Sequence, residues 1–370
     1  MGFKDAFDRY EWDLVRQKIY ASTPADVEKA LSKQGNCNLE DFNALISPAA
    51  LPYLEELANQ SNRITQKRFG KTIQMYIPMY MSNECQNICI YCGFSLDNKI
   101  RRTTLTDDQI KRELDIIKKL GYDHILLVSG EASRTVGISY FENAVRLVKE
   151  RFSNITLEVQ PLTEEEYRTL SHTGVYGILV YQETYHKENY KDYHSKGRKS
   201  NFEYRLEAPE RIGNAGIHKI GLGVLLGLED WRTDSWYCAM HLDYLKRKFW
   251  QTKFSLSFPR LRPAEGYHAP KSMMSDKELV QLICAYRLLD ENLELSISTR
   301  ESAIFRDNVL KLGITSISAG SRTDPGGYAA TLDALEQFEV HDNRTPHEVA
   351  SMIRQQGYEA VWKDWDVAIS

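Results

Sequence analysis

The sequence predicts an α/β fold in which parallel strands, each followed by a helix, close into a (β/α)8 barrel of the TIM type. From about residue 72 onward, short β-branched or apolar runs alternate with longer amphipathic stretches, which is typical of βαβ units. The alternation is complete within about 250 residues, the usual size of such a barrel. No repeat or low-complexity linker interrupts it, which favours one barrel with decorated ends over two independent domains.

Each element of the barrel is expected from its own segment. The strands are expected near 73–81, 123–129, 155–160, 176–182, 217–225, 253–258, 293–298 and 314–318. The helices between them are expected at 106–120, 139–152, 163–172, 204–215, 231–249, 275–290 and 301–312. These elements make residues 71–320 the barrel.

Two extensions flank the barrel. Residues 1–70 are expected to form a helical N-terminal extension, in which Thr23 caps a helix that has Pro24 in its first turn. Residues 321–370 are expected to form an extended C-terminal tail that packs on the barrel.

Composition excludes several classes of function. The chain has 370 residues, 42% hydrophobic, 26% charged and with a net charge of −4, so it lacks the basic excess that binding a phosphate backbone requires. No run approaches the length of a transmembrane helix, the N-terminus carries no apolar signal region, and Ala6 breaks the myristoylation pattern. We therefore expect a cytoplasmic protein that binds neither nucleic acid nor membrane.

Three of the six cysteines lie within eight positions. Cys85, Cys89 and Cys92 have the spacing C-x3-C-x2-C and follow the first strand, in the loop where barrel enzymes keep their chemistry. Three thiolates can bind three irons of a [4Fe-4S] cluster and leave the fourth iron open, whereas an electron-transfer ferredoxin site uses four cysteines. Structural zinc, which needs a fourth Cys or His, and a merely packed trio are the alternatives. The other cysteines are interpreted as isolated thiols: Cys37, Cys238 and Cys284.

This loop resembles the signature of the radical S-adenosylmethionine (SAM) superfamily, C-x3-C-x-aromatic-C after the first strand of a barrel. The resemblance implies that the open iron binds the amino and carboxylate groups of SAM. It also implies that reduction of the cluster splits SAM into methionine and a 5′-deoxyadenosyl radical. By the same resemblance Tyr91 lies near the adenine; a core aromatic is the alternative.

A second marker of that superfamily is a Gly-Gly-Glu-like turn that receives the SAM amino group. Ser129, Gly130 and Glu131 end the second strand and depart from that pattern by one residue. A glycine permits close backbone approach, and a carboxylate suits an ammonium donor. An ordinary turn is the alternative. The glycines at 221–227 do not fit a dinucleotide fingerprint and are expected to let the fifth strand pass close to SAM.

Residues from about 70 to 345 resemble the tyrosine lyases that make 2-iminoacetate for the thiazole ring of thiamine. The matching segments are Met79–Asn83, Cys92–Ser95, Tyr181–Thr184, Tyr204–Arg211, Ser257–Pro263, Ser298–Glu301 and Ser318–Arg322. The resemblance implies that SAM cleavage initiates Cα–Cβ scission of L-tyrosine. The products would be 2-iminoacetate (dehydroglycine), p-cresol, 5′-deoxyadenosine and methionine.

Candidate substrate and cofactor residues end other strands on the same face. Arg322, after the eighth strand, is the leading candidate for the tyrosine carboxylate because a guanidinium binds a carboxylate bidentately; Arg300, after the seventh, is the second choice. Tyr80 corresponds by position to an aromatic near the amino acid in related lyases. Glu183 is expected to contact SAM. For each of these residues a simple polar contact or ion pair at the barrel mouth is the alternative.

Missing cysteine motifs distinguish this chain from other enzymes of the superfamily. A hydrogenase-maturation tyrosine lyase carries a C-terminal C-x2-C site, but no cysteine follows Cys284. Biotin synthase requires three further cysteines beyond the SAM motif, where only Cys238 and Cys284 lie. A deazaflavin-precursor synthase stays open, and so, less favoured, does a non-catalytic iron–sulfur protein. The resemblance implies a thiazole synthase as partner, and cluster reduction requires a one-electron donor such as flavodoxin or ferredoxin.

Overall fold

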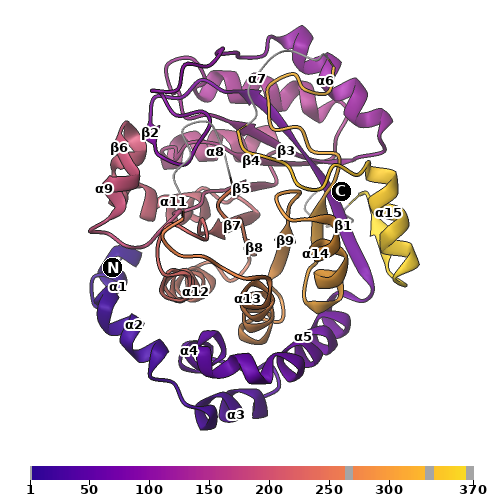
Figure 1. Cartoon of the computed structure of the whole chain (residues 1–370). Helices are drawn as coiled ribbons and strands as arrows, with labels where there is room; N and C mark the ends of the chain where they lie inside the picture. The colour runs from indigo at the N-terminus through magenta and orange to yellow at the C-terminus, as the bar shows by residue number, and fades with distance from the viewer. Residues whose placement is uncertain (1, 263–269, 330–336, 364–370) are drawn as a thin grey trace.

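The chain forms a barrel of parallel strands surrounded by helices in the computed structural model, which describes residues 2–262, 270–329 and 337–363 (Figure 1). The barrel strands are β1 (Thr72–Ser82), β3 (His124–Ser129), β4 (Asn154–Glu158), β5 (Gly177–Leu179), β7 (Lys219–Gly223), β8 (Lys253–Ser257), β9 (Glu294–Ile297) and β10 (Ser316–Ser318). The barrel closes where β10 pairs with β1, with Gln74 opposite Ser316. All eight predicted strands, and the predicted barrel, are confirmed.

Helices follow the strands around the outside. They are α6 (Asp107–Lys119), α7 (Ile138–Lys149), α8 (Glu164–Thr173), α12 (Trp231–Lys248), α13 (Asp276–Leu289) and α14 (Ala303–Val309), which the short 3-10 turn η3 (Leu310–Leu312) continues. The helix predicted over 204–215 is instead two, α10 (Phe202–Leu206) and α11 (Ala208–Asn214). Pro209 lies in the first turn of α11 and has no amide hydrogen to donate to the Arg205 carbonyl, so the helix is interrupted.

The N-terminal residues form helices that pack beside α12 and α13 (Figure 1). These are α1 (Phe3–Phe7), α2 (Trp12–Tyr20), α3 (Pro24–Ser32), α4 (Leu39–Ile46) and α5 (Leu54–Phe69), with the 3-10 turn η1 (Pro48–Tyr53) before α5. The predicted cap is confirmed, because the Thr23 side chain accepts a hydrogen bond from the Asp26 amide at the start of α3. No described helix has the length and apolar character needed to span a membrane.

The C-terminal segment is more ordered than an extended tail. It contains α15 (Pro346–Gln355) and the strand β11 (Glu359–Val361), which pairs in parallel with the start of β1. Thr345 and Glu348 form a capping box, and Pro346 occupies the first turn of α15. This is a helix-start signal that the sequence already contained. Residues 330–336 and 364–370 of the expected extension, and Pro263 of the segment Ser257–Pro263, lie outside the described residues.

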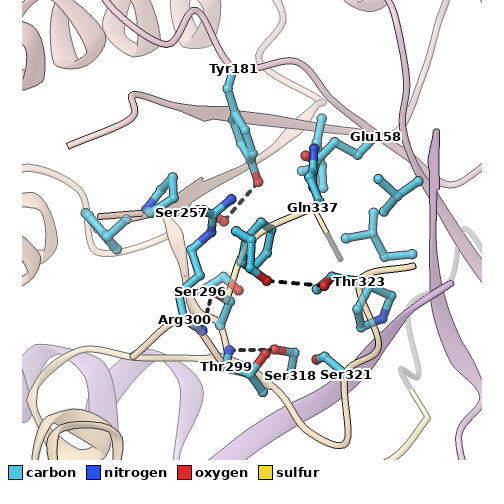
Figure 2. A pocket seen from close by; sticks show the side chains of 18 of the residues that line it. Glu158, Tyr181, Ser257, Ser296, Thr299, Arg300, Ser318, Ser321, Thr323 and Gln337 are labelled. Atoms are coloured by element: carbon cyan, nitrogen blue, oxygen red, sulfur yellow. Dashed lines mark hydrogen bonds between the residues drawn. The ribbon is translucent and has the colours of Figure 1, made fainter. Parts of the chain in front are cut away.

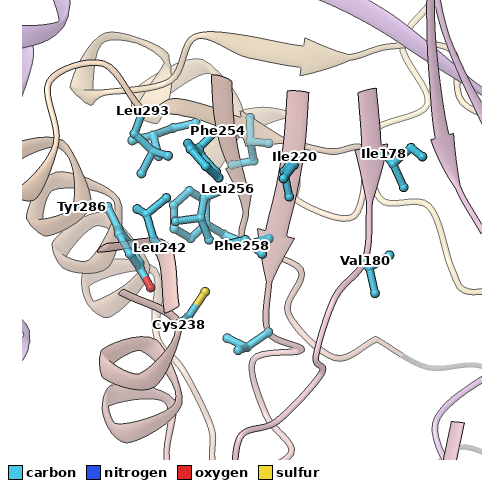
Figure 3. Packing of buried hydrophobic residues seen from close by; sticks show 14 of the residues in the cluster. Ile178, Val180, Ile220, Cys238, Leu242, Phe254, Leu256, Phe258, Tyr286 and Leu293 are labelled. Carbon is cyan, nitrogen blue, oxygen red and sulfur yellow. The ribbon is translucent and has the colours of Figure 1, made fainter. Parts of the chain in front are cut away.

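The main apolar core lies between the strands and the helices. Side chains such as Ile178, Ile220 and Leu256 point outward, and Leu242 and Tyr286 of the helices pack in the same core (Figure 3). Inside the barrel, where branched aliphatic residues usually dominate, many of the inward side chains are polar. The stability of the fold therefore comes from the outer layer, and the interior is free to carry chemistry.

Candidate active site at the mouth of the barrel

A cavity of about 170 Å³ runs from the carboxyl ends of the strands into the barrel. Cys92 and Tyr91 of the cysteine loop line it, together with side chains from every strand of the barrel. Figure 2 shows Glu158, Tyr181, Ser257, Ser296 and Arg300 around this space.

The cysteine loop is fastened to the barrel mouth at several points. Its short strand β2 (Ile88–Cys89) pairs with β6 (His194–Lys196), an antiparallel contact that the sequence did not predict. The Cys89 amide donates to the Ser95 hydroxyl over 3.0 Å, and the Gln337 amide nitrogen lies 3.7 Å from the Cys92 sulfur. The three cysteines thus lie in one rigidly held loop that borders the cavity.

The donor set of this loop fits an iron–sulfur cluster. Burial raises the pKa of the Cys85, Cys89 and Cys92 thiols, and the neighbouring cysteines add to the increase at Cys85 and Cys89. A strong Lewis acid such as iron is therefore needed to hold them as thiolates. Among the described residues no three His, Cys, Asp or Glu side chains are placed to hold one metal ion, as the zinc alternative requires. A [4Fe-4S] cluster has no such requirement, because each thiolate binds a different iron.

The Ser-Gly-Glu turn lies directly against the cysteine loop. The Gly130 amide donates to the Ser82 carbonyl over 2.9 Å, and a Cβ at this position would lie 2.2 Å from the Glu84 carbonyl oxygen. Only glycine fits there. The hydroxyl of Ser129 is buried and has no hydrogen-bond partner among the described residues.

Glu131 is held in its ionised form. Its carboxylate accepts a hydrogen bond from Arg205 at 2.7 Å and another from the side-chain amide of Asn87 at 2.8 Å. Burial acts to raise its pKa, but the positive charges of Arg205 and Lys199 outweigh burial and lower it. A carboxylate oxygen can accept a second donor, so this arrangement leaves room for the ammonium group that the sequence analysis assigned to it.

Glu183 is at the centre of a buried charge network that sequence reasoning only partly identified. It lies 2.7 Å from Lys199 and 3.7 Å from Arg205, and its backbone has a φ of +71°. A non-glycine residue in this left-handed region is strained, and such strain clusters at functional sites. The motif around Arg205 was noted in the sequence, but its contact with Glu131 and Glu183 depends on chain folding.

Tyr91 lines the cavity, and its hydroxyl lies 2.7 Å from the Nε2 atom of His194. The two rings meet edge to face, and the ammonium group of Lys199 lies 5.6 Å from the centre of the Tyr91 ring. His194 is anchored in turn by the Tyr190 carbonyl at 2.9 Å from Nδ1. Tyr91 is thus a positioned wall of the cavity, not part of the apolar core between strands and helices.

Tyr80 and Arg300 also line the cavity. The Tyr80 hydroxyl donates to the Gln337 side chain over 2.8 Å, and its ring meets Phe94 edge to face. The guanidinium of Arg300 reaches into the cavity and lies 3.4 Å from the centre of the Phe338 ring (Figure 2). Among the described residues it has no carboxylate within ion-pair distance. The described residues therefore leave its charge available for an anionic ligand.

Arg322 is not in the cavity, contrary to the sequence-based expectation. Its side chain is exposed, whereas its neighbours Ser321 and Thr323 line the cavity. The strand β10 ends at Ser318 and the chain turns at Gly320, which has a φ of +64°. Beyond this turn the position along the chain no longer predicts which way a side chain points.

Glu158 is a cavity residue that the sequence analysis missed. It ends β4 and lines the cavity opposite the Arg300 side chain (Figure 2). Burial, together with the negative charge of Glu183, raises its pKa to about 7. An acidic residue directly after the β-branched and apolar run 155–157 was the only signal for it, and it was not distinctive.

The fold and the cysteine loop define the class of this protein, a radical SAM enzyme. Residues 79–235 match the Radical SAM superfamily, and residues 257–359 match the Biotin and Thiamin Synthesis associated domain. A [4Fe-4S] cluster and SAM are the cofactors of this class.

The particular family follows from closer relatives. The chain is 50% identical over 365 residues to the 2-iminoacetate synthase of Salmonella typhimurium, covering 98% of this chain and 97% of the relative. The identity to the 2-iminoacetate synthase of Escherichia coli is also 50%, with the same coverage. The chain belongs to the 2-iminoacetate synthase family.

Solved structures agree with the fold. HydG, a maturase of the [FeFe]-hydrogenase, is similar with a TM-score of 0.89 and 30% identity, covering 95% of this chain and 80% of HydG. Methylornithine synthase (PylB) has a TM-score of 0.73 and 19% identity, covering 91% of this chain and 97% of PylB. The second likeness concerns the fold alone.

Proposed function

We propose that the protein cleaves the Cα–Cβ bond of L-tyrosine to 2-iminoacetate and p-cresol, for thiamine thiazole synthesis. The observation that carries this is a cavity that begins at the cysteine loop and contains an arginine without a carboxylate partner among the described residues. The kinship with 2-iminoacetate synthases supports it. When bound, the reduced cluster and SAM supply a 5′-deoxyadenosyl radical, while the protein positions the tyrosine.

The residues beside the cluster loop would bind SAM. Cys85, Cys89 and Cys92 would hold three irons, and Glu131 with Ser129 and Gly130 would receive the SAM amino group. Tyr91 and Glu183 face the same end of the cavity and would contact the remainder of the molecule. Lys199 pairs with Glu183 and Arg205 pairs with Glu131, and these contacts hold both carboxylates in place beside the cluster loop.

The residues on the opposite wall would bind tyrosine. Arg300 would pin its carboxylate, taking the role first expected of Arg322, and Tyr80 would border the amino acid. Glu158 faces Arg300 and would bind the amino group, since a carboxylate is the natural partner of an ammonium. Radical formation at the amino nitrogen requires it to lie against the 5′-carbon of SAM, and this pair of opposite charges fixes that position.

The partners follow from the chemistry. The cluster needs a one-electron donor, such as a flavodoxin or ferredoxin of the cytoplasm. The product 2-iminoacetate hydrolyses readily to glyoxylate, so we propose direct transfer to a thiazole synthase. Co-purification with that synthase would test the transfer.

One assay tests the proposed function. Anaerobically reconstituted protein with reductant, SAM and L-tyrosine should yield 5′-deoxyadenosine and p-cresol. SAM cleavage with a tyrosine adduct in place of p-cresol would indicate a deazaflavin-precursor synthase. Lack of any SAM cleavage would indicate a non-catalytic iron–sulfur protein.

A further inference from the structure

The cavity changes character along the axis of the barrel. Inward side chains recur every two residues along a strand, about 7 Å apart. On β1 the cavity residues are, from the mouth inward, Tyr80, Pro78 and Tyr76. On β3 they are Val128, Leu126 and His124.

The inward side chains of the other strands also follow one another from the mouth inward, so the cavity has three levels: a mouth, a middle and a floor. The mouth carries charged groups, among them Glu158 and Arg300. The apolar side chains of Pro78, Leu126 and Leu179 line the middle, and the hydroxyls of Ser257 and Ser318 also line the cavity. Glycines make this middle level possible, because a Cβ at Gly221 would overlap the Leu179 side chain.

The floor is polar again. Its members are Tyr76, His124, Thr156, Lys219, Ser255 and Ser296. The Ser296 hydroxyl donates to the Tyr76 hydroxyl over 3.0 Å, and Lys219 is paired with Glu294. Barrel interiors are normally filled by branched aliphatic residues, and burying polar groups costs free energy unless they are satisfied. A polar floor therefore indicates a polar ligand.

One floor residue lacks a partner. The His124 side chain is 5% exposed, and its Nε2 atom lies 3.3 Å from the Thr156 hydroxyl. Its Nδ1 atom is buried and has no hydrogen-bond partner among the described residues. Burial, reinforced by the positive charge of Lys219, lowers the pKa of His124 to about 3, so the ring is neutral. With its proton on Nε2, the ring presents Nδ1 as an acceptor.

The three levels match the three parts of tyrosine. The charged mouth fits the amino and carboxylate groups, the apolar middle fits the ring, and the floor fits the phenol hydroxyl. We propose that the floor of the cavity is the subsite that binds the tyrosine hydroxyl, which donates a hydrogen bond to Nδ1 of His124. This inference rests on the proposed tyrosine lyase function. It makes His124 the residue that distinguishes tyrosine from phenylalanine, because phenylalanine leaves the buried nitrogen unpartnered.

The test compares the two amino acids in the reconstituted holoenzyme. Binding of L-tyrosine and L-phenylalanine is measured in the presence of SAM for the wild type and for His124→Phe, Thr156→Val and His241→Phe. The wild type should prefer tyrosine by at least about tenfold. His124→Phe should abolish the preference by weakening tyrosine binding, and Thr156→Val should reduce it.

His241 is the matched control. It is a buried histidine with an unpartnered Nε2 among the described residues, but it stacks on Phe3 under α1, outside the cavity. Its variant should keep the preference for tyrosine. Iron content shows whether each variant assembles its cluster. If His124→Phe does not, the preference for tyrosine is measured in Thr156→Val and His124→Gln instead. The side-chain amide of glutamine restores a hydrogen-bond acceptor, so His124→Gln should keep part of the preference.

The possible outcomes separate the two claims. An unchanged preference for tyrosine in both floor variants would overturn the proposed subsite. An equal loss of that preference in the His241 variant would indicate a general packing effect and would also overturn it. A wild type that forms no p-cresol from tyrosine would instead refute the proposed function, whatever the floor variants do.

Discussion

At the scale of single residues, the cavity is governed by charges that the fold brings close together. Arg300 and Glu158 come from different strands and face one another across it (Figure 2). Burial lowers the pKa of the Arg300 guanidinium from its ordinary value, yet arginine stays charged at any physiological pH. A buried guanidinium that forms no ion pair with a described carboxylate attracts the carboxylate of a ligand strongly.

We expect Arg300→Lys and Arg300→Ala to lose tyrosine binding. Removing a bidentate, desolvated contact costs about 2–5 kcal/mol, which is more than tenfold in affinity. Lysine keeps the charge but not the planar fork. The measurement is the ratio of p-cresol to 5′-deoxyadenosine in a single turnover with saturating tyrosine, which should fall in both variants.

Arg322→Ala is the control for that prediction, because its side chain is exposed and lies outside the cavity. It should retain the wild-type ratio. If Arg322→Ala uncoupled the reaction and Arg300→Ala did not, the original assignment of the carboxylate site to Arg322 would be restored.

Glu158 should make the stability of the substrate-free protein depend on pH. Its carboxyl loses its proton near 4.5 when unfolded and near 7 when folded. Between these values the folded state holds more protons, so the free energy of unfolding falls as pH rises, and the loss is complete above pH 7. A difference of about 2.5 units corresponds to roughly 3 kcal/mol at most.

The check is urea unfolding at pH 5 and pH 8 of the wild type and Glu158→Gln. The glutamine side chain is neutral at both pH values, so the variant should lose much less stability than the wild type between pH 5 and pH 8. Glu183, Lys199, Arg205 and Arg300 face Glu158 and are the same in both proteins, so their contributions cancel. Identical pH dependence in the two proteins would show that Glu158 ionises normally in the folded state.

At the scale of elements, long periodic segments were predictable and short ones were not. The eight barrel strands were visible in the sequence as short β-branched or apolar runs that alternate with longer amphipathic stretches. The pair β2 and β6 has only two and three residues, too few to show any period. It forms because the folded barrel brings Cys89 beside His194.

The contact between the cysteine loop and β3 gives a prediction at this scale. In Gly130→Ala the new Cβ would meet the Glu84 backbone at 2.2 Å, so the loop must move, at a cost of about 1–3 kcal/mol. Cluster content after anaerobic reconstitution should fall. Ser129→Ala, in the same turn but without a clash, should retain its iron. Full iron content in Gly130→Ala would mean that the loop tolerates the displacement.

At the scale of the whole molecule, the cluster site and the stabilising core are separate. The main apolar core joins the strands to the helices and contains none of the three loop cysteines. Removal of the cluster by a chelator should therefore abolish SAM cleavage while the far-ultraviolet circular dichroism stays close to that of the intact protein. Loss of most secondary structure on iron removal would show instead that the cluster is needed for the fold.

The sequence by itself determined the barrel, the cluster loop and the Ser-Gly-Glu turn, because these depend on local spacing and on period along the chain. It also placed Tyr80, Tyr91, Glu183 and Arg300 at the cavity. Only the tertiary structure decided that Arg322 points to solvent and that Glu158 faces Arg300. Side-chain direction after a strand ends depends on the turn that follows. Arg205 contacts both Glu131 and Glu183 only because the closed barrel brings these residues together. They are far apart in the sequence, so no local pattern predicts the contact.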